Sequence, residues 1–62
     1  MKVELKKAEL YNVFTPTGEY KMITFEGFED KVDKTVAIFS DPVSQEFFEF
    51  EVGEGKLIVE YN

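Results

Sequence analysis

The sequence predicts an all-β domain, a small five-stranded and partly open barrel of the SH3-like kind, with an OB-like barrel as the second choice. Seven Phe and three Tyr among 62 residues are a composition that favours strands. Short apolar runs alternate with turn signals that contain Gly, Pro, Asp or Ser. No segment repeats its apolar residues at helical spacing for more than one turn. A chain of this length forms one core, so we expect a single domain over residues 1–62.

The first extended segment is expected over residues 2–14. Its apolar residues change parity along the segment, from Val3 and Leu5 to Ala8, Leu10 and Phe14. A strand whose apolar face switches sides needs an extra residue or a bend. The sequence therefore predicts a β-bulge or bend near Lys6 and Lys7.

Residues 15–18 predict a turn, because Pro16 suits the second position of a type I turn and Gly18 the fourth. A second strand is expected over 19–27, where apolar residues occupy both parities and indicate cover on both faces along part of its length. The mostly charged segment 28–34 is interpreted as a loop.

Residues 35–40 lack charge and are rich in β-branched and aromatic types, which is typical of a central strand. A turn at 41–44 leads to a fourth strand at 46–52, whose clean alternation gives it one wet face. A tight hairpin at 53–55 connects it to a fifth strand at 56–61. The predicted core consists of Ile38, Phe48, Phe50 and Val59.

The chain has no His, Cys, Trp or Arg, so it lacks the commonest catalytic and metal-binding side chains. Glu49 and Glu51 could in principle form a carboxylate pair, but alternate Glu on an outer strand face usually keeps the strand wet. A loop cluster of hard oxygen ligands does not match the spacing of a calcium loop; it comprises Glu26, Glu29, Asp30 and Asp33. We expect neither an enzyme, nor a cofactor, nor a metal site.

A formal net charge of −6 opposes the phosphate backbone and argues against direct nucleic-acid binding. It favours a partner with a basic surface. No apolar run reaches the length of a signal peptide or a membrane span, so we expect no membrane association and a cytoplasmic location. The Lys-only basic set and the small single-domain size favour a phage or other mobile-element origin, which would make this the host cytoplasm.

The function that the sequence predicts is a non-catalytic protein-interaction module, a small accessory, regulatory or assembly protein. Tyr11 and Phe47 are out of phase with their core-facing neighbours and are the expected aromatic anchors. The expected acidic contact residues are Glu46, Glu49, Glu51, Glu54 and Glu60. Three alternatives stay open: an acidic nucleic-acid mimic that inhibits a DNA- or RNA-binding protein, a single-strand-binding OB-like domain, and self-association into a homo-oligomer.

Overall fold

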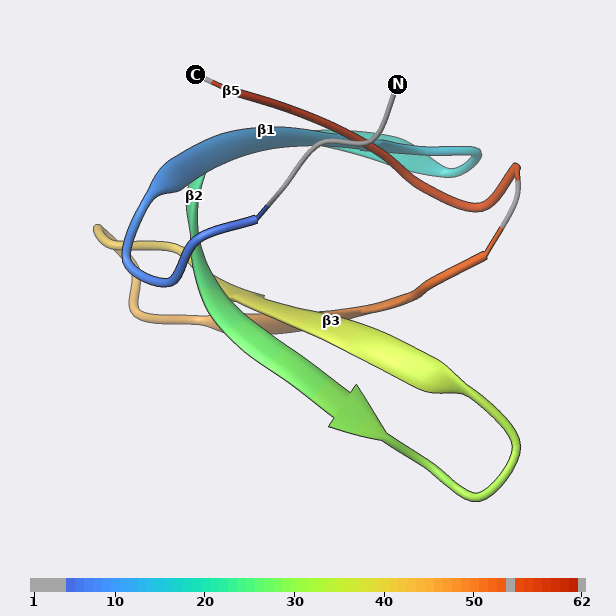
Figure 1. Cartoon of the computed structure of the whole chain (residues 1–62). Coiled ribbons are helices and arrows are strands. Elements are labelled where there is room, and N and C mark those ends of the chain that lie inside the picture. The colour runs from blue at the N-terminus through green and yellow to red at the C-terminus, as the bar shows by residue number, and fades with distance from the viewer. Residues whose placement is uncertain (1–4, 54, 62) are drawn as a thin grey trace.

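The computed structural model describes residues 5–53 and 55–61 and shows one sheet of five strands without a helix in those residues. The strands are β1 (Leu10–Thr15), β2 (Gly18–Asp30), β3 (Thr35–Ser40), β4 (Phe47–Glu51) and β5 (Ile58–Tyr61). Their order across the sheet is β4-β3-β2-β1-β5 (Figure 1), and every neighbouring pair is antiparallel. The expected all-β class is confirmed. The sheet is not closed into a barrel, because β4 and β5 form its two edges. These two strands do not pair with each other among the described residues, so the expected hairpin between them is wrong.

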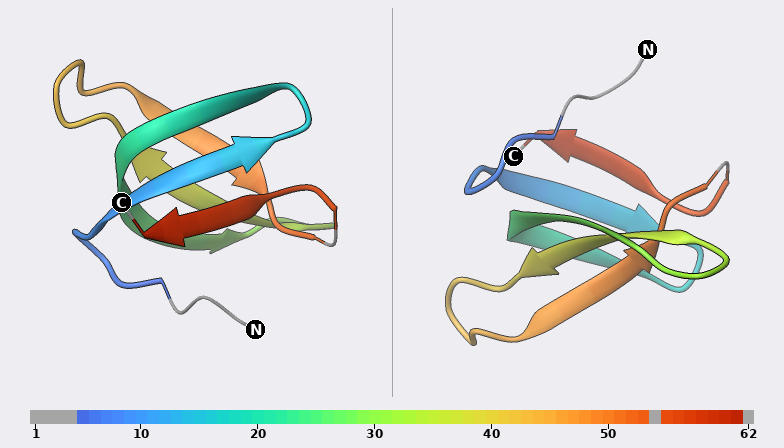
Figure 2. Two further views of the ribbon diagram at one scale, coloured as in Figure 1. Left: turned by 90° about the horizontal axis from the view of Figure 1, so that it is seen from above. Right: turned by 60° about the horizontal axis from the view of Figure 1, so that its bottom comes forward.

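Two β-bulges bend β2 and let one strand serve two layers. The first lies opposite Asn12, where Met22 adopts a φ of 57° and donates its backbone N–H to Asn12 Oδ1 at 3.0 Å. The second lies between Phe25 and Gly27, and Gly27 has a φ of 142°. The beginning of β2 pairs with β1 and its end with β3, so the strand curves from the upper layer into the lower one (Figures 1 and 2).

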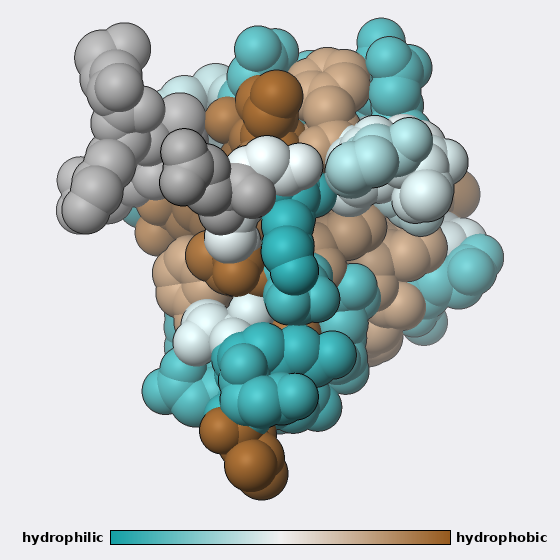
Figure 3. Space-filling model, turned by 90° about the vertical axis from the view of Figure 1, so that its right-hand side faces the viewer, coloured by the Kyte–Doolittle hydropathy of each residue, from teal (hydrophilic) through white to brown (hydrophobic). Residues whose placement is uncertain are grey.

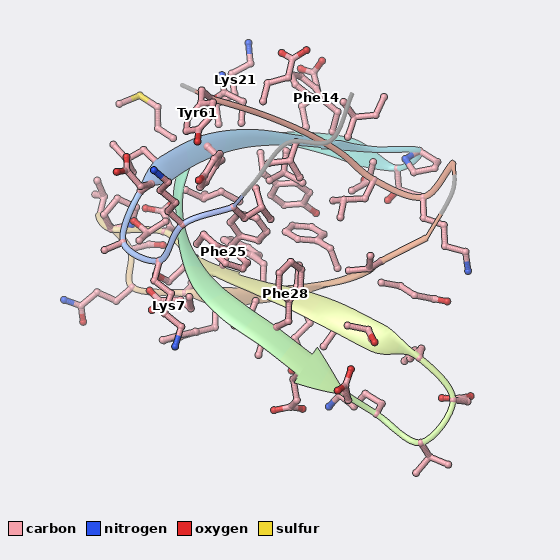
Figure 4. The ribbon with its side chains drawn as sticks, viewed as in Figure 1. Lys7, Phe14, Lys21, Phe25, Phe28 and Tyr61 are labelled. Carbon is pink, nitrogen blue, oxygen red and sulfur yellow. The ribbon has the colours of Figure 1, made fainter. Side chains whose placement is uncertain are left out.

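The core lies between the two layers and is largely aromatic. The rings of Tyr11 and Phe25 meet edge-on at a centroid distance of 6.4 Å, and those of Tyr11 and Phe39 at 6.3 Å. Edge-to-face packing is favoured by the charge distribution of aromatic rings. Figure 4 shows Phe25 and Phe28 directed into the space between the layers, whereas Phe14 and Lys21 point away from it. The buried core cluster consists of Tyr11, Val13, Ile23, Phe25, Ala37, Phe39 and Phe50.

The first strand is shorter than expected and begins at Leu10. The chain does turn at Lys7 and Ala8, close to the predicted bend, and Ala8 has a φ of 69°. Glu9 still accepts the backbone N–H of Phe25 at 3.1 Å, so the pairing with β2 continues into this segment. The part of the expected strand before residue 5 lies outside the described residues.

The prediction of a loop over 28–34 is wrong in its first half, because β2 continues to Asp30. Phe28 pairs with Ala37 of β3, and its ring lies 5.0 Å from the ring of Phe25. That contact holds a charged segment in the sheet. Only residues 31–34 form the connection, which is closed by a hydrogen bond of 2.6 Å from the N–H of Lys31 to the carbonyl of Lys34.

The predicted core is correct for Phe50, which is buried, and Phe48 and Val59 pack against it while half-buried. Ile38 is wrong as a core residue. Ala37 and Phe39 are fully buried in the cluster, and side chains alternate along a strand, so Ile38 lies on the outer face of β3. The residues from Val36 to Phe39 are all apolar, so the sequence does not indicate which face of this strand is buried.

Candidate partner-binding groove

Two hollows adjoin at the end of the molecule that carries the β1–β2 turn. The first lies between this turn and β4; it has a volume of about 380 Å³ and is lined by Tyr20, Phe50, Glu49, Glu51, Lys56 and residues 15–17. The second lies between the same turn and the β4–β5 connection, has a similar volume of about 380 Å³, and is lined by Phe14, Leu57, Ile58, Thr15, Pro16, Gly55 and Lys56. We name the two hollows together the turn groove.

Thr15, Pro16 and Lys56 line both hollows and so form the boundary between them. Pro16 stands in the two-residue turn where the sequence predicted it, and Thr15 pairs with Gly18 across the turn. Thr15 Oγ1 also donates to the Gly18 carbonyl at 3.1 Å. Figure 3 faces this end of the molecule and shows apolar surface interrupted by hydrophilic side chains.

Tyr20 supplies the aromatic wall of the first hollow from the beginning of β2. Its ring lies 5.2 Å from that of Phe48 and 5.0 Å from that of Phe50. Both partners belong to β4, the edge strand of the other layer. Side-chain packing therefore joins the layers at a place where no strand pairing does so among the described residues.

The charged side chains that line the first hollow all take part in ion pairs; they are Glu49, Glu51 and Lys56. Lys56 Nζ lies 2.7 Å from Glu51 Oε1, and this hydrogen bond, with the attraction between the two charges, lowers the pKa of Glu51 from its ordinary value. Lys31 Nζ lies 2.8 Å from Glu29 Oε2 and 3.6 Å from Glu49 Oε1. The hydrogen bond to Glu29, followed by the attraction of both carboxylates, raises the pKa of Lys31. All five side chains in these pairs are well exposed to solvent.

The structure brings some of the predicted contact residues together. Phe47, Glu49 and Glu51 alternate along β4 with the inward-facing Phe48 and Phe50, and all three are exposed. Phe47 is 69% exposed, as expected for an outward aromatic. Glu46 is exposed and immediately precedes β4.

Glu60 is exposed but lies apart from that group. It stands on β5, opposite Asn12 of β1, and β5 is the other edge of the sheet. Glu54 falls outside the described residues.

The expectation that Tyr11 is an outward anchor is wrong, because the side chain has no exposed surface. Tyr11 and Val13 are the buried residues of β1, whereas Leu10 is exposed and Phe14 half-buried. The prediction assigned the core to the opposite parity. The Tyr11 hydroxyl is accommodated because it accepts the N–H of Lys6 at 2.7 Å.

Sequence reasoning missed Pro16, Tyr20, Lys56 and Ile58 as groove residues. Each was assigned to a turn or strand, but the hollows arise where a turn, an edge strand and a second connection meet. That meeting depends on strand order, which the residue pattern does not encode. The one local signal was the presence of apolar residues on both parities of 19–27.

Three of the four acidic residues that were considered as metal ligands have other partners, and Glu29 is paired with Lys31. Glu26 Oε2 accepts the hydroxyl of Ser40 at 2.5 Å, and Asp30 Oδ1 accepts that of Thr35 at 2.7 Å. Within residues 5–53 and 55–61, no three carboxylates are grouped so that they could hold a metal ion. Nor does that part of the chain contain a helix with the length and apolar character that crossing a membrane requires.

The chain matches no protein-family model, no curated protein and no solved structure. Its function is therefore inferred from the geometry and chemistry of its surface.

Proposed function

We propose that this chain is a non-catalytic protein-interaction module, a small accessory, regulatory or assembly protein that binds another protein through the turn groove. The turn groove is the observation that carries the proposal. It combines an aromatic wall, an apolar hollow and a charged rim at one end of the molecule. Protein interfaces have the same composition, with buried aromatic or aliphatic anchors inside a polar rim.

The open edge of β4 adds a second mode of contact. Among the described residues, β4 pairs only with β3. The other side of a sheet-edge strand presents backbone N–H and C=O groups, and an extended segment of a partner can pair with them. Because Glu49, Phe50 and Glu51 of β4 line the first hollow, a segment bound there contacts both the edge and the aromatic wall.

A partly open, SH3-like barrel is the architecture that this proposal assumes. The two bulges of β2 and the packing of Tyr20 against Phe50 support it, since they curve the sheet and join its layers. In a small barrel of this kind, the connections at one end are available to form a binding surface while the strands hold the core.

The alternative of an acidic nucleic-acid mimic receives less support. A mimic needs a row of carboxylates whose charges are free to attract a basic groove. Three carboxylates on the outer side of the lower layer share two ammonium groups, those of Lys31 and Lys56. The mimic would compete with duplex DNA or RNA for its partner, whereas a groove-bound segment would not.

Selection of short random peptides displayed on phage tests the proposal, with two variants as readouts. Ile58 is 62% exposed and lines the groove; Val43 is 91% exposed and lies in the β3–β4 turn, outside both hollows. We expect Ile58→Asn to weaken binding of the selected peptides at least about tenfold and the matched Val43→Asn to leave it unchanged. Equal effects of the two variants, or the recovery of no peptide, would contradict the proposal.

A further inference from the structure

We infer that the occupant of the turn groove is an extended, basic segment of the partner, with a Lys or Arg that replaces Lys56 on Glu51 and a neighbouring aliphatic side chain in the hollow beside Ile58. The inference rests on the proposed function and specifies the chemistry of the ligand. It combines the position of Lys56, the weakness of its ion pair, the charge of the chain and the shape of the two hollows.

Lys56 already shows what kind of group the rim accepts. Its ammonium lies 2.7 Å from Glu51 Oε1, and its side chain lines both hollows. The same carboxylate can accept the ammonium of a partner's Lys or the guanidinium of an Arg, and Arg adds the option of a two-pronged bond. Lys56 thus occupies the position of a ligand cation.

The pair that must open is easily exchanged. The Lys56 and Glu51 side chains are 52% and 43% exposed. Ion pairs of such exposure contribute little, because water screens the charges and the long side chains lose freedom when they pair. An incoming cation that also brings an anchored neighbour therefore competes well with Lys56.

The charge of the molecule favours a basic ligand over an acidic one. The formal net charge is −6, and Glu49 stands at the rim with Lys31 at the longer distance of 3.6 Å. Lys31 lies closer to Glu29. It therefore neutralises the charge of Glu49 only in part, and Glu49 can attract a further cation. Such complementarity raises the rate of encounter and disfavours acidic partners.

The two hollows suit a chain in the extended conformation. Successive side chains of a strand point to opposite sides, so a basic residue and its aliphatic neighbour diverge. One hollow has carboxylates at its rim, and the other is lined by Phe14, Leu57 and Ile58. They meet at Pro16 and Lys56, so adjacent residues of one segment can enter both.

The probe is a short synthetic peptide of alternating Lys and Leu, compared with the same peptide carrying Gln in place of each Lys. We expect calorimetric binding of the Lys peptide at low salt, weaker binding at high salt, and little binding of the Gln peptide. Glu51→Gln should weaken binding of the Lys peptide about fivefold. Lys56→Gln should strengthen it about two- to fivefold, because the competing cation is gone.

Lys7→Gln is the matched control for Lys56→Gln. It makes the same change in net charge, but the Lys7 side chain lies beside Gly27 and lines neither hollow. We expect it to change binding by less than about twofold. Equal binding of the two peptides, absence of binding, or equal effects of Lys7→Gln and Lys56→Gln would overturn the inference. The proposed function is tested separately, by the effect of Ile58→Asn on binding of the library-selected peptides.

Discussion

The backbone N–H of Lys6 donates a hydrogen bond of 2.7 Å to the hydroxyl of Tyr11, whose side chain is completely buried. The bond ties the segment before β1 to the core and gives the only polar atom of the Tyr11 side chain a partner. A buried hydroxyl without a partner would be costly.

Tyr11→Phe should therefore lower the free energy of unfolding by about 0.5–1.5 kcal/mol and speed amide exchange at Lys6. Chemical denaturation and hydrogen-exchange NMR measure the two effects. Tyr20→Phe is the matched control, since the Tyr20 ring packs on Phe48 and Phe50 at the surface end of the core. An equal loss in both variants, with no change at Lys6, would refute this role of the hydroxyl.

Phe50→Ala should destabilise the protein by about 3–5 kcal/mol, because it leaves a cavity between the layers. The Phe50 ring contacts those of Tyr20 and Phe39 at centroid distances of 5.0 and 5.7 Å. Phe47→Ala removes the same side chain from an exposed position of the same strand and should cost less than about 0.5 kcal/mol. Thermal and chemical unfolding measure the stability of both variants. If β4 faced the other way, Phe47→Ala would destabilise the protein more than Phe50→Ala.

Gly27→Ala should destabilise the fold by about 1 kcal/mol or more. Gly27 has a φ of 142°, which side chains rarely adopt, and a Cβ atom there would lie 3.3 Å from Lys7 Cε. Gly18→Ala is the control, because its Cβ would lie 3.9 Å from the nearest side-chain atom. A neutral Gly27→Ala would mean that β2 does not need this bulge to change layers.

Lys56→Met should raise the pKa of Glu51 back towards its ordinary value. The hydrogen bond from Lys56 is the main cause of the lowered pKa. Because the pKa of Glu51 is lower in the folded state, the ion pair stabilises the folded protein at pH values above the ordinary Glu range. This stabilisation is lost as the pH falls through the folded-state pKa. NMR titration of the Glu51 carboxyl carbon measures the change, and Lys7→Met should leave that titration unaltered.

The number of strands and their approximate positions were predictable because local pattern determines them, and β3 has the expected bounds of residues 35–40. The buried face of β1 was not predictable, because the strand has apolar residues on both faces; they are Leu10, Tyr11, Val13 and Phe14. Only the contacts of Tyr11 with β2 and β3 decide which side is buried. The bulge at Met22 was also not predictable, because the residue with positive φ there is not a glycine.

The candidate site was predictable in character but only partly in position. The exposed acidic face of β4 followed from its alternation, as Glu49 and Glu51 show. Pairing of these carboxylates with Lys31 and Lys56 depends on how loops approach β4. The turn groove is a property of tertiary arrangement, and its residues come from segments that the sequence does not show to be neighbours.

The most direct test of the proposed binding surface is an NMR titration of the isotopically labelled protein with peptides selected from the random library. We predict that the largest amide shifts cluster at residues 15–20, at β4 and at residues 56–58, the segments that form the turn groove. Shifts concentrated around Leu10 and Met22, which are exposed outside both hollows, would contradict it and place the binding surface elsewhere.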